Sequence, residues 1–396
     1  MTSASDLNLS TADRLHQRAL AALPGGNSRT TVFMAPRPPY AVRGEGCELI
    51  DADGRRVLDL LNNYTALVHG HARAEVVEAA VDALRGGSCF GLPTEHEIEL
   101  AERLRARIPS AARWRFTNSG SEAVMMAIRL ARAATGRSAV LRFQGAYHGS
   151  YDAAMQPPAR GVPASVEEEI VTVAFGDGDA LEAVLAEHGS RLACVLFDAM
   201  PNRAGLRPAT PEFARALREQ TRRHGVLLVQ DEVITLRLAF GGLQELYGIE
   251  PDITTVGKVM GGGFPIGGVG GREELMALFD PSRPDAVAHP GTFNANPVSM
   301  RAGAAALDLL TVEEIARINA LGDRLREGLM ERGWDVSGQG SLVKVRAPDQ
   351  EALWWSLYGE GVLIAAQGLI ATSTAMDDTS IERALEAFDR VGSGAR

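Results

Sequence analysis

Residues 226–271 read VLLVQDEVITLRLAFGGLQELYGIEPDITTVGKVMGGGFPIGGVGG, and this stretch decides the fold. An apolar strand at residues 226–229 leads directly to Asp231, and a second segment carries Lys258 into a glycine-rich turn. In parallel α/β sheets, ligands bind beyond the carboxyl ends of the strands. We therefore expect Asp231 to face a ligand.

The chain around this stretch alternates between apolar runs and helical patterns. Strand-like runs without polar alternation occur at residues 139–143 and 192–197, and helical patterns occur at residues 122–134 and 211–224. Strands of this kind, separated by helices, predict a mostly parallel α/β sheet that is buried on both faces.

The two ends of the chain differ from this central part. Short strands around the turn Asp53-Gly54 are expected within residues 40–61, and helices with short strands are expected after residue 297. We predict three parts: an N-terminal arm with part of a small domain (1–60), a large domain (61–290) and a small α+β domain (291–396).

Composition excludes several classes of function. The 396 residues carry a formal net charge of −10, which argues against nucleic acid or an anionic membrane surface as a partner. Three widely spaced cysteines (Cys47, Cys89 and Cys194) form neither a disulfide framework nor a metal-ligand pattern. The N-terminus lacks the pattern of a signal peptide, and no apolar run reaches the roughly 18 residues of a membrane span. We expect a cytoplasmic protein without a metal site.

Lys258 and Asp231 are the strongest candidate catalytic residues. Chemistry based on pyridoxal 5′-phosphate (PLP) needs a lysine that holds the cofactor as a Schiff base and a carboxylate that keeps the pyridine nitrogen protonated. Each residue alone is more simply explained as a solvated lysine or an ordinary carboxylate at a strand end. Together, in this context, they predict a PLP site.

Two further motifs fit the same site. Residues 116–123 (FTNSGSEA) place Ser119, Gly120 and Ser121 between a strand and a helix, where backbone N–H groups can bind a phosphate. Residues 145–149 (GAYHG) place Tyr147 and His148 after a strand, where an aromatic ring can stack on a flat cofactor. A capping turn and a core tyrosine are the simpler alternatives for the two motifs.

Together with residues 291–297 (GTFNANP), these motifs resemble the class III (subgroup II) aminotransferases of PLP fold type I. This family includes ω-aminotransferases, glutamate-1-semialdehyde aminomutases and β-amino acid (β-phenylalanine) aminotransferases. The resemblance implies a large domain with a seven-stranded type of sheet, completed by a small domain from both chain ends. It also implies a homodimer with shared active sites.

The resemblance assigns a role to each motif. Lys258 would form the Schiff base, and Asp231 would pair with the pyridine nitrogen. Val233 and Tyr147 would cover the two faces of the cofactor ring. The other cofactor-binding residues would be Ser119, Gly120, Ser121, His148 and, from the neighbouring subunit, Thr292.

The substrate residues are predicted from residues 24–29 (PGGNSR), where the family brings an N-terminal arm across the pocket. Arg29 can bind a carboxylate through two parallel hydrogen bonds, although a solvated arginine after a turn is the alternative. Val32 and Phe33 suit a side-chain pocket or, equally well, ordinary core. Two insertions usual in the aminomutases, after Gly26 and before Arg237, are missing, as in the β-amino acid aminotransferases.

The chain also departs from the family pattern. Asp198 stands where many members have a glutamate, and Gln367 lies where an arginine for a dicarboxylate acceptor is expected. We predict an aminotransferase that moves the amino group of a carboxylate-bearing amine, such as a β-amino acid, to an oxo-acid acceptor. The alternatives are a 2,1-aminomutase or another PLP isomerase, and a PLP-binding protein without turnover.

Overall fold

The computed structural model describes residues 9–392 of the chain. In that part of the chain, seven strands form one sheet in the order β4-β10-β9-β8-β7-β5-β6. Neighbours within β5–β9 are parallel, and β10 is antiparallel to both β4 and β9. The predicted mostly parallel, seven-stranded sheet is therefore confirmed. The strands are β4 (Arg113–Thr117), β5 (Ala139–Phe143), β6 (Ile170–Val173), β7 (Leu192–Phe197), β8 (Leu227–Asp231), β9 (Ile253–Gly257) and β10 (Gly267–Gly271).

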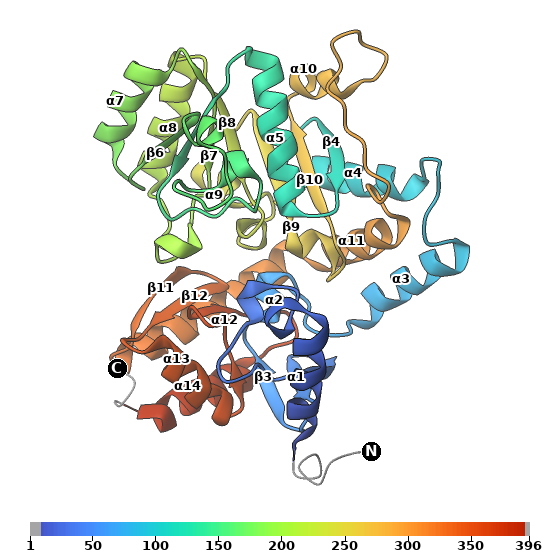
Figure 1. Ribbon diagram of the computed structural model, residues 1–396, viewed down its shortest axis with the longest axis vertical. Helices are drawn as coiled ribbons and strands as arrows, with labels where there is room; N and C mark the ends of the chain where they lie inside the picture. The colour runs from blue at the N-terminus through green and yellow to red at the C-terminus, as the bar shows by residue number, and fades with distance from the viewer. Residues whose placement is uncertain (1–8, 393–396) are drawn as a thin grey trace.

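Helices cover both faces of this sheet (Figure 1). Helix α5 packs over the centre of one face. On the other face, α7 to α9 cover one part, and α4 and α11 cover the part near β4 and β9. The helices of the larger lobe are α3 (Ala74–Gly86), α4 (Glu95–Arg107), α5 (Gly120–Thr135), α6 (Ala164–Glu167), α7 (Gly178–His188), α8 (Pro211–Arg223), α9 (Leu243–Tyr247), α10 (Glu273–Met276) and α11 (Pro297–Leu309).

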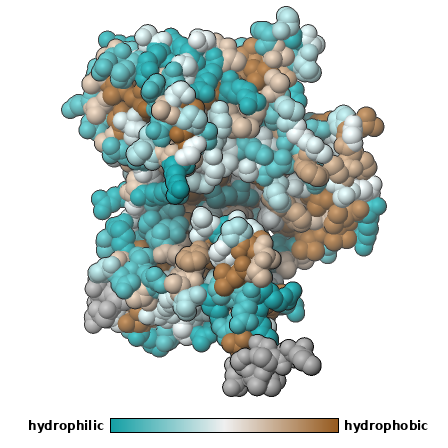
Figure 2. Space-filling view, viewed as in Figure 1, coloured by the Kyte–Doolittle hydropathy of each residue, from teal (hydrophilic) through white to brown (hydrophobic). Residues whose placement is uncertain are grey.

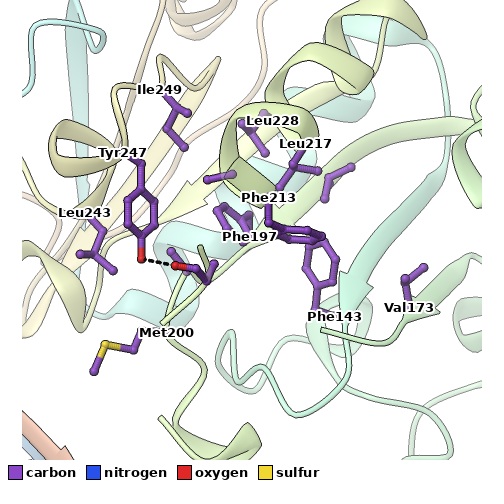
Figure 3. Close-up of a cluster of buried hydrophobic side chains, with 14 of the residues drawn as sticks. Phe143, Val173, Phe197, Met200, Phe213, Leu217, Leu228, Leu243, Tyr247 and Ile249 are labelled. Atoms are coloured by element: carbon purple, nitrogen blue, oxygen red, sulfur yellow. Dashed lines mark hydrogen bonds between the residues drawn. The ribbon is translucent and has the colours of Figure 1, made fainter. Parts of the chain in front are cut away.

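An aromatic cluster anchors β5 and β7 to α8 (Figure 3). The ring of Phe143 lies 5.8 Å from the rings of both Phe197 and Phe213, at steep interplanar angles. Such edge-to-face contacts add about 0.5–1.5 kcal/mol each to the burial of the rings. Because Phe197 is the last residue of β7 and enters this core, the next residue, Asp198, leaves the strand at a fixed position.

A smaller lobe is built from both ends of the chain, as predicted (Figure 1). One sheet has the order β1-β2-β3-β13 and the other the order β11-β12-β14. The turn at Asp53-Gly54 joins β2 and β3 as the expected antiparallel pair. The elements are α1 (Thr11–Ala22), β1 (Ala41–Glu45), β2 (Glu48–Asp51), β3 (Arg56–Asp59), α2 (Asn62–Thr65), α12 (Val312–Glu331), β11 (Asp335–Gln339), β12 (Leu342–Arg346), α13 (Gln350–Gly359), β13 (Val362–Leu363), β14 (Leu369–Ala371) and α14 (Asp378–Val391).

Strand β10 was not expected from the sequence, since glycine disfavours strand interiors. A Cβ atom on Gly270 would lie 2.6 Å from the Trp114 ring, and one on Gly267 would lie 2.0 Å from the backbone oxygen of Ser119. The glycines are required because β10 packs tightly against its neighbours. The expected glycine-rich turn after Lys258 is confined to the residues before this strand.

The division of the chain into domains remains a prediction. Helix α11 follows the predicted boundary at residue 290, yet it packs against α3 and α4 of the larger lobe. We therefore propose that the C-terminal part of the small domain begins after this helix. Among the described residues, no helix is long and apolar enough to cross a membrane.

Candidate active site

A cavity of about 400 Å³ opens beside the carboxyl end of β8. Figure 2 shows a hollow between the two lobes of the protein, and hydrophilic residues form much of its surface. Many of the predicted site residues meet at this cavity. Its walls contain Arg29, Asn118, Ser119, Gly120, Ser121, Tyr147, His148, Asp198, Asp231, Val233, Ile234, Lys258 and the segment 264–266.

Asp231 is the last residue of β8 and is almost fully buried. One carboxylate oxygen accepts a hydrogen bond from the backbone N–H of Val233 at 3.0 Å. The other lies 2.7 Å from Nδ1 of His148, while Nε2 of this histidine has no hydrogen-bond partner among the described residues. Because His148 is itself buried, it holds the carboxylate in one orientation inside the cavity.

Lys258 begins a short 3₁₀ turn, η7 (Lys258–Gly261), directly after β9. Its φ of 47° lies in the left-handed region, a strained conformation that is concentrated at functional sites. Burial lowers the pKa of its amine, and the nearby carboxylates of Asp231 and Asp198 oppose this effect. The sequence contains one other lysine, Lys344, so few amines can compete for an aldehyde.

The first turn of α5 forms another wall of the cavity. Ser119 caps this helix by accepting a hydrogen bond from the backbone N–H of Glu122 at 3.2 Å. The backbone N–H groups of a first helical turn have no partners within the helix and attract anions. Gly149, at φ 96°, brings the loop with Tyr147 against this turn, since a Cβ atom there would lie 2.3 Å from Oγ of Ser121.

These groups fit the chemistry of PLP. An anion site at a helix N-terminus suits the phosphate, a buried carboxylate suits the pyridinium nitrogen, and a lysine with a lowered pKa suits the aldehyde. Asp231, Lys258 and the turn at Gly120 all line one cavity. PLP therefore fits this cavity because the anion site, the carboxylate and the amine that it needs all lie there.

Val233 and Tyr147 also line this cavity. Val233 packs against the first turn of α5, where a Cβ atom on Gly120 would lie 3.0 Å from its methyl groups. The ring of Tyr147 is 44% exposed, and the guanidinium carbon of Arg203 lies 4.6 Å from its centre. Stacking of these two residues on a cofactor ring remains a prediction.

The predicted substrate residues are only partly brought together. Arg29 lines the cavity and donates a hydrogen bond to Oδ1 of Asn63 at 3.1 Å. Val32 lines a separate apolar cavity of about 140 Å³, and Phe33 is 58% exposed. Thr292 lies on an exposed loop beside a different cavity, formed with residues 89–94. Within one chain, these three residues do not line the cavity with Lys258.

The structure adds residues that the sequence analysis did not select for the site. Asn118 lines the cavity and donates a hydrogen bond to Oδ1 of Asn294 at 3.0 Å, which links the cavity to the loop of Thr292. Asp198, noted only as a departure from the family pattern, also lines the cavity. Its position at the carboxyl end of a buried strand was a usable signal, because Asp231 lies at the carboxyl end of the neighbouring strand β8.

Two buried carboxyl groups beside Asp231 have raised pKa values. Burial, reinforced by the charge of Asp231, raises the pKa of Asp198 to about 7, and its carboxylate accepts a hydrogen bond from the backbone N–H of Met200 at 2.9 Å. Burial also raises the pKa of Glu232 to about 7, although this carboxylate accepts hydrogen bonds from Thr235 and from the backbone of α9. Of these two groups only Asp198 lines the cavity, so near neutral pH its carboxyl is partly protonated beside Asp231.

Comparison with known proteins agrees with this chemistry. The family model "Aminotransferase class-III" matches residues 34–391. An ω-transaminase from Sphaerobacter thermophilus superposes with a TM-score of 0.95 at 43% identity, covering 98% of each chain. A β-phenylalanine aminotransferase from Variovorax paradoxus gives a TM-score of 0.89 at 35% identity, covering 96% of this chain and 93% of its own.

Among curated relatives, a glutamate-1-semialdehyde 2,1-aminomutase from Methanothermobacter thermautotrophicus is 38% identical over 356 residues, or 86% of this chain and 84% of the relative. The chain belongs to the class III aminotransferase family. It is a PLP-dependent aminotransferase, a family that acts on small-molecule amino donors and oxo-acid acceptors.

The assignment of Lys258 can be tested by chemical trapping. Borohydride reduction of the protein with PLP is expected to fix the cofactor on Lys258, because this amine lines the cavity together with Asp231 and the first turn of α5, whereas Lys344 does not. Peptide mapping by mass spectrometry measures the site. Lys344→Gln serves as the control and should retain the label, whereas Lys258→Ala should lose it. Labelling of Lys344 in the unaltered protein would refute the assignment.

The raised pKa of Asp198 predicts a pH-dependent stability. Its folded-state value of about 7 lies above the ordinary 3.8, so stability from the protonated carboxyl is complete below pH 3.8 and is lost as pH rises through 7. Asp198→Asn removes this loss. In the cofactor-free protein, the stability of Asp198→Asn relative to the unaltered protein should therefore increase between pH 4 and 8, by on the order of a few kcal/mol.

Thermal unfolding at several pH values measures this difference. The matched control is Asp280→Asn, because Asp280 is exposed and hydrogen bonds from Ser282 lower its pKa. Its substitution should give no gain with rising pH. A constant difference for Asp198→Asn across the range would mean that this carboxyl is ionised at acidic pH in the folded protein.

Proposed function

We propose that the chain transfers the amino group of a β-amino acid to an oxo-acid acceptor. The observation that carries this proposal is Arg29, whose guanidinium lines the same cavity as Lys258 and makes no ion pair with an acidic residue of the described chain. A guanidinium can bind a carboxylate through two parallel hydrogen bonds and so fix its orientation. Similarity to a β-phenylalanine aminotransferase supports the same substrate class.

PLP, when bound, supplies an electrophilic carbon and a ring that accepts electrons. The chain supplies the remaining steps. The amine of Lys258, with its lowered pKa, can accept a proton from the reacting carbon and return it, and Arg29 orients the substrate so that this proton faces the lysine. The carboxylate of Asp231, held by His148 and the backbone of Val233, stabilises positive charge on the pyridine nitrogen.

An intramolecular 2,1-aminomutase is the second candidate, and it is favoured by the curated relatives with that name. The two activities differ in one requirement. An aminotransferase needs an external oxo acid to complete its cycle, whereas an aminomutase converts its substrate without one. Turnover in the absence of any added oxo acid therefore distinguishes them.

Half-reactions with separate amines test the aminotransferase proposal. The absorption band of the lysine-bound cofactor should bleach with β-phenylalanine or β-alanine. Arg29→Gln should slow this change by roughly tenfold or more for a carboxylate-bearing amine, but much less for 1-phenylethylamine, which lacks a carboxylate. The control is Arg43→Gln, because Arg43 is an exposed residue of β1 paired with Glu45.

Comparing the half-reactions with different amines then distinguishes between the substrate classes. A band that bleaches with L-glutamate but with neither β-amino acid would keep the aminotransferase and overturn the β-amino acid assignment. Equal slowing with and without a substrate carboxylate in Arg29→Gln would remove Arg29 from carboxylate binding.

We also propose that the protein acts as a homodimer with shared sites. Exposed apolar side chains gather on α3 and the loop after it, and Figure 2 shows a hydrophobic area over α3. A large exposed apolar area favours a protein interface. Thr292 and the 59% exposed Phe293 lie on the loop next to this surface. The exposed apolar residues are Val77, Val81, Leu84, Phe90 and Leu92. The cytoplasm remains the predicted location.

Complementation between two inactive variants tests this arrangement. Lys258→Ala lacks the reactive amine, and Thr292→Asp places a negative charge where the partner's cofactor phosphate is expected. When the two variants are co-expressed and assemble together, one site of the mixed dimer combines an intact Lys258 with an intact Thr292, so activity should return in part. Co-purified mixed dimers without activity would show that Thr292 does not act across the interface.

A further inference from the structure

The short segment α2 (Asn62–Thr65) turns in the left-handed sense. Its four residues, none of them glycine, have φ angles of 48°, 46°, 57° and 77° in chain order. Elsewhere in residues 9–392, non-glycine residues with positive φ occur singly. Each such residue costs free energy, and such conformations persist where the surrounding structure enforces them, often at functional sites. A run of four therefore indicates that this turn has a role beyond joining β3 to α3.

Contacts from both lobes hold the turn in place. The carboxylate of Asp59 accepts a hydrogen bond from the backbone N–H of Asn62 at 2.9 Å, and the side-chain amide of Asn62 donates to the backbone oxygen of Ala371 at 2.7 Å. The buried guanidinium of Arg237, from the larger lobe, donates to the backbone oxygen of Thr65 at 3.2 Å. Figure 1 shows α2 on the side of the smaller lobe that faces the larger lobe. The turn is therefore fixed at the junction of the lobes.

The middle of the turn holds the segment that carries Arg29. The Oδ1 atom of Asn63 accepts a hydrogen bond from a guanidinium N–H of Arg29 at 3.1 Å. Two residues further along this segment, the backbone oxygen of Thr31 accepts a hydrogen bond from the hydroxyl of Tyr64. The Tyr64 ring also lines the apolar cavity of about 140 Å³ together with Val32. Two neighbouring residues of the turn thus hold the segment at two successive points.

Asparagine suits position 63 for two reasons. It is one of the few residues other than glycine that adopt the left-handed conformation without a large penalty. Its side-chain oxygen is a neutral acceptor, so it orients the guanidinium of Arg29 without cancelling the positive charge. Within residues 9–392 this is the hydrogen bond that the guanidinium makes, so its other donors remain available to a carboxylate in the cavity. An acidic residue at position 63 would compete with the substrate for Arg29.

We infer that Asn63 is a positioning residue, which directs Arg29 into the cavity and so sets the preference of the site for amines that carry a carboxylate. This inference rests on the proposed function and deepens it by naming a residue that determines the substrate class. The hydrogen bond from Arg29 to Asn63 limits the directions that the guanidinium can take before the substrate binds. A backbone of ordinary right-handed φ would send the side chain of Asn63 in another direction, which explains why the strained turn is retained.

Half-reactions of holoenzyme variants with two amines test this inference. β-Phenylalanine carries a carboxylate and 1-phenylethylamine does not, so the ratio of their rate constants measures carboxylate recognition. Asn63→Gly keeps the left-handed backbone but removes the acceptor, so it should lower this ratio by roughly threefold to tenfold without lowering the unfolding temperature. Asn63→Asp keeps an acceptor but pairs Arg29 with a negative charge, so it should lower the ratio further.

The matched control is Ala72→Gly. Ala72 also has a positive φ, of 52°, and lies beside a different cavity, so glycine relieves the same kind of strain away from Arg29. This variant should leave the ratio unchanged. Equal slowing of both amines in Asn63→Gly would overturn the inference, because it would mean that Asn63 only supports the fold. An unchanged ratio in Asn63→Gly would overturn it as well.

A double-mutant cycle separates this inference from the proposed function. Once Arg29→Gln has removed the guanidinium, the addition of Asn63→Gly should change the ratio no further. A ratio that falls in Arg29→Gln but not in Asn63→Gly would overturn only the role of Asn63. An unaltered holoenzyme that reacts with no β-amino acid would overturn the proposed function instead. The role of Asn63 would then be read from calorimetric titration with 3-phenylpropanoate, an unreactive carboxylate: a weaker affinity in Asn63→Gly supports it, and an unchanged affinity overturns it.

Discussion

The close packing of glycines around the first turn of α5 is the constraint on which the site depends. Gly267 of β10 approaches the backbone oxygen of Ser119, and Gly149 approaches Oγ of Ser121, at distances that exclude a Cβ atom. Gly120 makes a similar contact with Val233. These contacts bring strand β10 and two loops to the N-terminus of one helix. The anion site, the carboxylate of Asp231 and the reactive lysine can share one cavity because no side chain separates the loops.

The candidate catalytic and phosphate-binding residues could be predicted because each belongs to a short, local sequence pattern. Asp231 ends an apolar strand, and Ser119 lies between a strand and the glycine at which a helix begins; both patterns are visible within a few residues. Strand β10 was missed, since its glycines are explained only by contacts with Trp114 and Ser119 that are distant in sequence. A local pattern indicates chemistry, whereas a tertiary contact decides where a glycine is needed.

The sequence was a poorer guide to residues whose placement depends on how the lobes and subunits meet. Val32 and Phe33 follow Arg29 closely in sequence, yet a short 3₁₀ turn at Thr30–Val32 directs them away from the cavity that Arg29 lines. Thr292 lies on a loop whose predicted partner is another chain. Sequence patterns carry no direct signal for such contacts.

The presence of only two lysines, Lys258 and Lys344, has a further consequence. Every other basic side chain that is permanently charged is an arginine, and guanidinium groups do not condense readily with aldehydes because they stay protonated. Lys344 is partly shielded by the loop at Asn202, which engages its amine. Carbonyl compounds, whether cofactor, acceptor or product, therefore meet very few competing lysine amines on this protein. A surface built in this way should resist glycation and should be difficult to immobilise through lysine-directed coupling.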